Sequence, residues 1–376
     1  MQRLLALTML IASFALSAMP AFLSDYGDGL KFYKSKNYAR AISSFRKAAE
    51  QGDARAQSNL GVMYDTGQGV AQDYKQAVSW YQKAAAQGDA RAQSNLGVMY
   101  DKGQGVAQDY KQALFWYQKA AAQGHAEAYF NLGVMYENGK GVAQDYKQAV
   151  SWYQKAAVQG VAAAQFNLGV MYFEGKGVAQ DYKHAVSWYQ KAAAQGYSTA
   201  QYNLGQMYRQ GEGLAQDYKQ AASWYQKAAA RRYGPAQYNL RVMYDKGEGV
   251  ERDYKQAVSW YQKAATQGIA AAQTGLGDMY ADGKGVARDY KRAVFWYQKA
   301  AAQGDADAQT NLGVMYADGK GVSQDYVEAH KWWDLAVANG DAGARKNREI
   351  VKRRMTRDQI AEAERRASEW MKAHGK

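Results

Sequence analysis

Few residues in this chain of 376 have the types and spacing that catalysis requires. Ser44 and Lys47 stand three residues apart, a pattern in which a lysine could activate a serine nucleophile for acyl transfer. The Ser-Asp-Asn and Lys-Thr-Gly motifs that would complete such a site do not accompany them, and both residues fall inside an expected helix. The sequence therefore predicts that the protein is not an enzyme.

Residues that could bind a metal or a cofactor are equally scarce. The chain has no cysteine, which excludes a thiolate nucleophile, a disulfide framework and a cysteine-ligated metal site. Of its four histidines, His184 and His330 lie far apart in the sequence and are not expected to share a metal. No Walker A motif is present, and no glycine-rich dinucleotide motif follows a predicted strand. We expect no catalytic residue, no metal and no cofactor.

What recurs instead is tryptophan. One falls every 36 residues without insertion or deletion, at Trp80, Trp116, Trp152, Trp188, Trp224, Trp260, Trp296 and Trp332. Strict self-similarity at this period is typical of repeat architectures. Eight copies of one unit, the first running from Asp53 to Gly88, therefore fill residues 53–340. We expect these tryptophans to belong to the structural core rather than to a ligand cage.

The first half of each unit predicts a helix, called helix A here. Ala56, Leu60 and Met63 repeat at three- and four-residue spacing, and two glycines in three residues then mark a loop. Gly61 lies inside helix A, where glycine costs about 1 kcal/mol relative to alanine. Because a glycine recurs at this position in most units, we expect another element to press close against it.

The second half of each unit predicts helix B. Asp73 should cap it, with Gln76 as the other half of a capping box, and Gly88 should end it in a left-handed conformation. A single pair of helices leaves most of its apolar faces in water, whereas stacked neighbouring pairs bury them. The predicted fold class is therefore all-α, an α/α solenoid of stacked antiparallel helix pairs.

The N-terminal end differs from the repeats. Arg3, the apolar run Leu4–Leu16 and small residues up to Ala21 predict a signal peptide over residues 1–21. An uncleaved N-terminal membrane anchor is the alternative. The expected protein is therefore exported, to the periplasm or out of the cell.

Two further segments flank the array. Residues 22–52 predict a shorter helix pair that serves as an N-terminal cap, and residues 341–376 predict C-terminal capping helices. Thr356 and Gln359 should cap the last of these helices.

The repeated residues resemble a known family. Residues 57–64 (QSNLGVMY), 67–70 (GQGV) and 80–85 (WYQKAA) are similar to the Sel1-like repeat, a subclass of tetratricopeptide-type helical repeats. The resemblance implies a right-handed superhelix that binds proteins or peptides, usually without catalysis. Residues 22–52 look like an ordinary tetratricopeptide unit, and the tail resembles the closing helices of secreted bacterial members. Some exported members have been associated with penicillin binding or β-lactamase activity.

Some units depart from the repeated pattern. Arg241 replaces the helix A glycine of the sixth unit, and Gly275 replaces a recurrent asparagine in the seventh. Arg231 and Arg232 replace the usual Gln-Gly at the end of the fifth. These changes predict either an irregular seam over residues 230–241 or plain sequence drift.

The units disagree most at four positions of helix A, which in the first unit are Arg55, Ser58, Val62 and Asp65. Their spacing predicts one stripe beside the buried stripe. In tetratricopeptide-type repeats the matching positions line the concave groove, so the resemblance implies the same here. The recurrent asparagine of helix A, Asn59 in the first unit, could hydrogen-bond a ligand backbone or tie adjacent helices together.

The Ser58 position is aromatic in the middle four units. These residues, called the aromatic ladder here, are Phe130, Phe166, Tyr202 and Tyr238. We expect them to anchor a partner, because interfaces concentrate binding energy in such side chains. Arg91, Arg209 and Phe173 should lie beside them in the groove. Alternatively, the rings only cover gaps between repeats.

The net charge of +13 at pH 7 permits attraction to anionic envelope polymers or nucleic acid. However, we expect no single helical stripe to gather lysine and arginine, and an exported protein rarely meets nucleic acid. A solvated charged surface is the simpler interpretation.

Three function classes remain. The first is an exported, non-catalytic scaffold or adaptor that holds a protein or peptide partner in its groove. The alternative is a carbohydrate- or peptidoglycan-associated envelope binding protein, because aromatic platforms also suit sugar rings. A β-lactamase-like hydrolase is the remote alternative.

Overall fold

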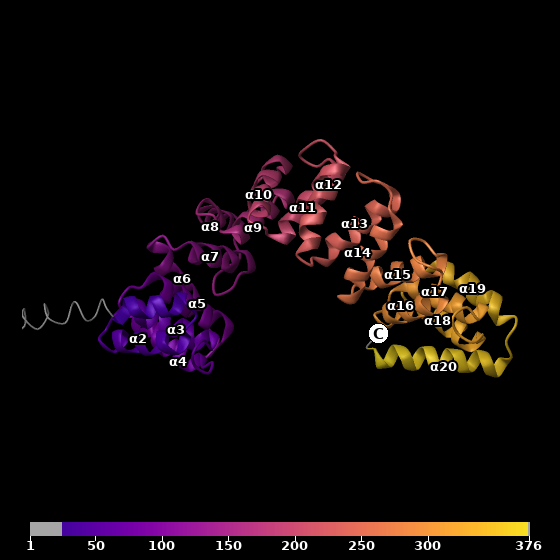
Figure 1. Cartoon of the computed structure of the whole chain (residues 1–376), viewed down its shortest axis with the longest axis horizontal. Coiled ribbons are helices and arrows are strands. Elements are labelled where there is room, and N and C mark those ends of the chain that lie inside the picture. The colour runs from indigo at the N-terminus through magenta and orange to yellow at the C-terminus, as the bar shows by residue number, and fades with distance from the viewer. Residues whose placement is uncertain (1–24, 375–376) are drawn as a thin grey trace, which may run out of the picture. The chain divides into compact units, whose positions relative to one another are not determined.

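The structure is a computed structural model that describes residues 25–374. Over these residues it consists of helices and short connections, without a strand, which confirms the all-α prediction (Figure 1). The predicted signal peptide lies outside the described residues. No helix in the described part of the chain has the length and apolar character needed to cross a membrane.

The eight units each contain two helices of 13 residues. Helix A corresponds to α3 (Ala54–Thr66), α5 (Ala90–Lys102), α7 (Ala126–Asn138), α9 (Ala162–Glu174), α11 (Ser198–Gln210), α13 (Gly234–Lys246), α15 (Ala270–Asp282) and α17 (Ala306–Asp318). Helix B corresponds to α4 (Tyr74–Ala86), α6 (Tyr110–Ala122), α8 (Tyr146–Val158), α10 (Tyr182–Ala194), α12 (Tyr218–Ala230), α14 (Tyr254–Thr266), α16 (Tyr290–Ala302) and α18 (Tyr326–Ala338). Helical residues 25–34 and α2 (Tyr38–Glu50) precede the units, and α19 (Ala342–Lys352) and α20 (Arg357–Ala373) follow them.

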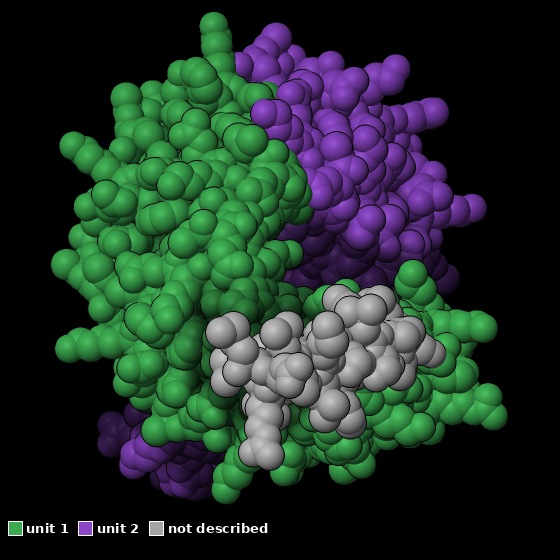
Figure 2. Space-filling model, turned by 90° about the vertical axis from the view of Figure 1, so that its left-hand side faces the viewer, with its two compact units in different colours: residues 1–188 green, residues 189–376 purple. Residues whose placement is uncertain are grey.

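The chain forms two compact units of tertiary structure, residues 1–188 (unit 1) and 189–376 (unit 2), with the boundary inside α10 (Figure 2). In unit 1 each helix from α2 to α9 packs against the next, and α3 also contacts α5. In unit 2 the same holds from α11 to α19, and α20 folds back on α18. Unit 1 and unit 2 are therefore each a stack of helix pairs, with the A helices in one layer and the B helices in the other.

Aspartate caps begin the B helices, as predicted. The Asp73 carboxylate accepts hydrogen bonds from the backbone N–H groups of Lys75 (2.9 Å) and Gln76 (3.0 Å). The predicted return bond from the Gln76 side chain is wrong, because the N–H of Asp73 donates instead to the carbonyl of Tyr64 at 2.9 Å. This backbone bond closes the A–B loop, so the loop replaces the capping box.

The helix ends behave as the sequence predicts. Gly88 follows α4 with φ +92°, a conformation that favours glycine. At the other end of the chain, Thr356 and Gln359 form a complete capping box at the start of α20. At both of these helix ends, the residue types in the sequence therefore predict the backbone conformation.

The ring at the centre of each unit is a tyrosine of helix B. Tyr81 is 0% exposed and packs on Gly61, where an added Cβ would lie 2.4 Å from the ring. This confirms the expected close approach at the helix A glycine. The same contact recurs between Gly97 and Tyr117, Gly133 and Tyr153, Gly205 and Tyr225, and Gly277 and Tyr297. In the eighth unit Trp333 takes the tyrosine's place against Gly313.

The recurrent tryptophans lie at the margin of the core rather than at its centre. Trp80 and Trp116 are half-buried, and each packs on the apolar cluster formed by the preceding unit and its own helix A. Only Trp332 is nearly enclosed, because Trp370 of α20 packs against it at a ring separation of 6.2 Å. The tryptophans are structural, as expected, but each one joins neighbouring pairs.

A buried glutamine of helix A links consecutive pairs, and the sequence analysis missed it. The Gln93 side chain donates to the carbonyl of Ala85 (3.2 Å) at the end of the preceding helix B and accepts from Gln123 (2.8 Å). The same donor bond is made by Gln57, Gln165, Gln201, Gln237, Gln273 and Gln309. The Ala85 carbonyl also accepts from the backbone N–H of Gly88 at 3.0 Å, so the glutamine supplies its second hydrogen bond. A bond of this kind contributes about 1 kcal/mol, and each glutamine thereby helps to hold two pairs in register.

The departures at Arg241 and Gly275 are coupled in space. Arg241 occupies the position at which other repeats have the helix A glycine. Its guanidinium lies 4.0 Å from the ring centre of Tyr261. A Cβ on Gly275 would lie only 1.9 Å from the Tyr261 ring. Since the other units accommodate asparagine at that position, Tyr261 has moved toward the seventh unit, and Gly275 gives it room. The regular bonds across residues 230–241 are kept, since Gln237 donates to the Ala229 carbonyl at 3.2 Å and accepts from Gln267 at 2.7 Å. The departure is therefore confined to the surroundings of Tyr261.

Candidate partner-binding surface

The variable stripe of helix A lies partly inside the stack. Ser58 and Ser94 are only 2% and 3% exposed, so a small residue at this position is enclosed by its neighbours. In contrast, all four residues of the aromatic ladder are half-buried. Their larger rings fill the enclosed space and continue beyond it to the surface.

Two ladder rings lie in unit 1. The Phe130 ring lies 5.9 Å from that of Tyr153, the central ring of its own unit, and packs on the core cluster of α8 and α9. Phe166 is half-buried at the same position of α9. One side of the Phe130 ring is therefore packed, and part of it stays accessible.

The other two ladder rings lie in unit 2. Tyr202 lies 5.7 Å from Tyr225 and 5.4 Å from Tyr233, and Arg241 covers Tyr238 at 4.6 Å from its ring centre. Burial raises the pKa of the Tyr202 hydroxyl, so this group is un-ionised at neutral pH and can donate a hydrogen bond. Both rings contact the core on one side.

The three residues predicted beside the ladder have structural contacts of their own. Arg91 is exposed, and its guanidinium donates to the Asn59 side chain of the preceding helix A at 3.1 Å. Arg209 is exposed and lies near the Tyr225 hydroxyl, whose pKa is raised to about 12, chiefly by burial. Phe173 is half-buried at the end of α9, with its ring 5.2 Å from that of Tyr182. Arg91 and Phe173 lie in unit 1, and Arg209 lies in unit 2.

The recurrent asparagine ties adjacent A helices together where its bonds are seen. Asn239 donates to Gln206 at 3.2 Å, and Asn311 donates to Asp278 at 3.1 Å. Both acceptors belong to the preceding unit, at the position of Val62. The structural alternative is therefore confirmed for these two residues.

Asp278 is a half-buried carboxylate that the sequence analysis passed over. It accepts hydrogen bonds from the Tyr297 hydroxyl at 2.7 Å and from Asn311. Burial raises the pKa of this carboxyl, Asp282 and Asp307 raise it further, and the Tyr297 hydrogen bond and the Arg241 charge oppose the shift. The available signal was the replacement of a recurrent valine by an acid in the seventh unit.

The residues considered for catalysis do not come together into a site. Ser44 is half-buried and Lys47 exposed on α2. His330 is buried in α18, where its Nδ1 lies 2.9 Å from the Asp334 carboxylate, and Asp334 also binds Arg348 at 2.9 Å. Among the described residues, no group of histidine and acidic side chains could hold a metal ion.

Comparisons with known proteins agree on the repeat. The family model described as Sel1 repeat matches nine consecutive ranges, residues 21–53, 54–89, 90–125, 126–161, 162–197, 198–233, 234–269, 270–305 and 306–341. The first of these ranges is the segment that the sequence analysis assigned to the N-terminal cap. Curated proteins give no match.

Two solved structures are similar over most of the chain. A Sel1 repeat protein from Oxalobacter formigenes is 35% identical, with a TM-score of 0.61, over 82% of this chain and 90% of its own. A protective antigen present in uropathogenic Escherichia coli strains, which displays an SLR fold, is 33% identical, with a TM-score of 0.52, over 96% of this chain and 94% of its own.

The raised pKa of Asp278 predicts how stability depends on pH. Because the folded protein holds this proton more tightly than the unfolded chain does, ionisation above the folded pKa costs stability, and the cost disappears at low pH. Asp278→Asn should therefore raise the free energy of unfolding at pH 7, by about 1 kcal/mol for each unit by which the pKa is raised, and change it little at pH 3. Urea unfolding at both pH values measures this. The exposed Asp318→Asn, at the equivalent of position 282 in the next repeat, is the control, and a loss of stability at pH 7 for Asp278→Asn would contradict the assignment.

Proposed function

Because the chain belongs to the Sel1 repeat family, we propose that it is a non-catalytic scaffold that holds a protein or peptide partner on its helix A surface. Solenoids of this kind typically mediate protein–protein interaction, which supports the class of function. The aromatic ladder supports the location. Its four rings occupy one position of the variable stripe, and they reach the surface where Ser58, Ser94 and Thr274 of other units are buried.

The packing around the ladder supports a binding role as well as a structural one. The first two repeats have serine at the ladder position, whereas the third and fifth have Phe130 and Tyr202. All four of these repeats have the same central tyrosine packed on the same helix A glycine. The core therefore does not require an aromatic ring there. A half-buried ring held on one side by the core offers a large contact area at low entropic cost.

Replacing Phe166 and Tyr202 by serine, the residue that the first two units use, tests this proposal. We expect partner affinity to fall by about tenfold or more, since truncating an aromatic anchor at an interface costs at least 1–2 kcal/mol. The melting temperature should fall only modestly, because one side of each ring is packed and the serines of the first two units show that the fold tolerates this residue. A crosslinking pull-down from the native source supplies the partner, and calorimetry then measures its affinity for each variant.

Phe295→Ser is the matched control, because it removes an exposed ring from helix B and introduces the same residue. A large drop in melting temperature with partner affinity retained would show that the ladder only packs between repeats. Retention of the protein on glycan or cell-wall arrays, without binding to any peptide, would favour the carbohydrate alternative.

We further propose that the protein is exported, to the periplasm or beyond the cell. This rests on Arg3, the Leu4–Leu16 run and the small residues up to Ala21. Mass spectrometry of protein recovered from its native source should find a mature N-terminus between Ala18 and Phe22. An intact Met1 in the membrane fraction would instead indicate an uncleaved anchor.

A further inference from the structure

The face of helix B that points away from helix A carries lysines that neither the core nor the ladder uses. Seven B helices, from α4 to α16, each have a lysine at the second and tenth residues and contain no aspartate or glutamate. These lysines, called the lysine face here, are Lys75, Lys83, Lys111, Lys119, Lys147, Lys155, Lys183, Lys191, Lys219, Lys227, Lys255, Lys263, Lys291 and Lys299, and all are exposed. The expectation that no helical stripe gathers lysine is therefore wrong, because two lysines eight residues apart share one side of a helix.

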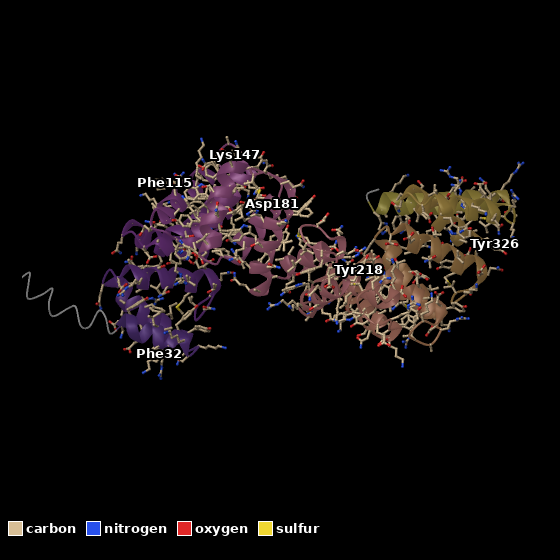
Figure 3. All side chains as sticks on the ribbon, turned by 90° about the horizontal axis from the view of Figure 1, so that it is seen from above. Phe32, Phe115, Lys147, Asp181, Tyr218 and Tyr326 are labelled. Atoms are coloured by element: carbon tan, nitrogen blue, oxygen red, sulfur yellow. The ribbon has the colours of Figure 1, made fainter. Side chains whose placement is uncertain are left out.

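The direction of the lysine face follows from what helix B buries. On α4, Ala77, Tyr81 and Ala84 are buried against the A helices on either side. Lys75, Ser79 and Lys83, spaced four residues apart, lie on the opposite side and are exposed. The same spacing places the lysines of α6 and α8 in unit 1, and of α12, α14 and α16 in unit 2, on the outer side of the B layer. Figure 3 labels Phe115 of α6 and Lys147 of α8 along one edge of unit 1.

Tryptophan holds the second lysine of several helices in place. The Nζ of Lys83 lies 4.1 Å from the ring centre of Trp80, and the corresponding distances are 4.1 Å for Lys155 on Trp152, 3.6 Å for Lys227 on Trp224 and 3.8 Å for Lys263 on Trp260. Cation–π contacts of this kind keep the charge while restricting the side chain. These lysines therefore lose less side-chain conformational entropy when they bind an anion.

One exposed aromatic ring lies within the lysine face of each unit of tertiary structure. Phe115 in unit 1 is 44% exposed and Phe295 in unit 2 is 50% exposed. Five of the other 36-residue repeats have serine at this position. Each ring lies between lysines one turn before and one turn after it, and Nζ of Lys119 is 4.6 Å from the Phe115 ring centre. Nζ of Lys299 is 5.1 Å from that of Phe295. A single exposed apolar side chain is common on protein surfaces, so each ring is informative only through its position among the lysines.

We propose that the lysine face docks on the surface of an anionic lipid membrane. Two lysines on one helix are about 12 Å apart along its axis. Successive B helices are joined through the A helix that packs between them, so their lysines repeat on the same side of each stack and the positive charges form a two-dimensional array. A layer of phosphate headgroups meets both rows of lysines at once, whereas a single linear polyanion follows one row. Phe115 and Phe295 gain from the apolar layer just below the headgroups, as aromatic residues do on membrane-surface helices. The partner surface and the membrane surface then lie on opposite layers of the stack.

Vesicle co-sedimentation with the full chain tests this proposal. The protein should bind vesicles of phosphatidylcholine mixed with phosphatidylglycerol, fail to bind phosphatidylcholine alone, and lose affinity as salt is added. Lys111→Gln with Lys119→Gln should weaken binding by about tenfold or more, since each lysine near an anionic surface contributes about a factor of five. Phe115→Ser with Phe295→Ser should also weaken it, with circular dichroism unchanged.

The matched control removes two lysines that lie outside the lysine face. Lys140 and Lys176 lie in A–B loops and pair with Asp101 and Glu174, so Lys140→Gln with Lys176→Gln changes the net charge equally. Equal loss of binding in this control would overturn the proposal, because net charge alone would explain the attraction. Binding to heparin or single-stranded DNA without binding to anionic vesicles would also overturn it and identify a linear polyanion as the ligand. Vesicle binding unaffected by the phenylalanine changes would exclude insertion below the headgroups.

Discussion

The contact between a helix A glycine and a helix B tyrosine sets the spacing of the whole stack. An added Cβ on Gly61 would lie 2.4 Å from the Tyr81 ring, so no other residue fits there without moving the ring. The tyrosine can then fill the space between two helices of one unit and reach the first helix of the next. The Tyr81 hydroxyl accordingly lies beside Asp65 of its own unit and Asn95 of the following one. Tyrosine burial and glutamine bonds accompany this contact in the regular units, and they also persist beside Arg241, where Tyr261 is 3% exposed and Gln273 donates to the Ala265 carbonyl.

The sixth and seventh units show what happens when this contact is lost. Arg241 occupies the glycine position, stacks on Tyr261 and Tyr238, and leaves no room for the ring in its usual place. The ring lies instead against Gly275, where the other units have a larger residue. Arg232 nearby adopts a left-handed backbone, with φ +63°, where other units have glycine. Arg241 is thus accommodated by a second change in the next unit, at Gly275, and the glutamine bonds on either side are kept.

Much of the fold follows from the sequence, because the strict 36-residue period and the Asp and Gly signals fix where helices start and stop. The sequence pattern did not identify the most buried ring. Tryptophan and tyrosine are adjacent in helix B and equally regular, and only the glycine opposite Tyr81 decides which of them is enclosed. The glutamine bonds were missed because Gln57 and Gln87 are 30 residues apart and polar, and their burial depends on how neighbouring units stack. The lysine face was missed because each helix contributes only two lysines, eight residues apart, and they become one surface only through the stacking of the helix pairs.

The candidate site could be predicted only in part. The aromatic ladder was found from differences between units, and the structure adds that its rings are half-buried against the core. Arg91 was expected to contact a partner, but its bond to Asn59 depends on the approach of two A helices, which no local pattern reveals. Asp278 differs from its equivalents by a single substitution, and its raised pKa arises from surroundings contributed by other helices.

A double-mutant cycle at residues 241 and 275 tests most directly whether the glycine–tyrosine contact governs the stacking. Gly275→Asn alone should lower the free energy of unfolding by about 1–3 kcal/mol, because the new side chain meets the displaced Tyr261 ring. Helix propensity would act in the opposite direction, since asparagine is more favourable than glycine inside a helix. With Arg241→Gly also present, Tyr261 can return to the usual position, and the double variant should recover most of that loss, a coupling of about 1 kcal/mol or more. Additive effects of the two substitutions would contradict the account, because Tyr261 would then not connect the two positions.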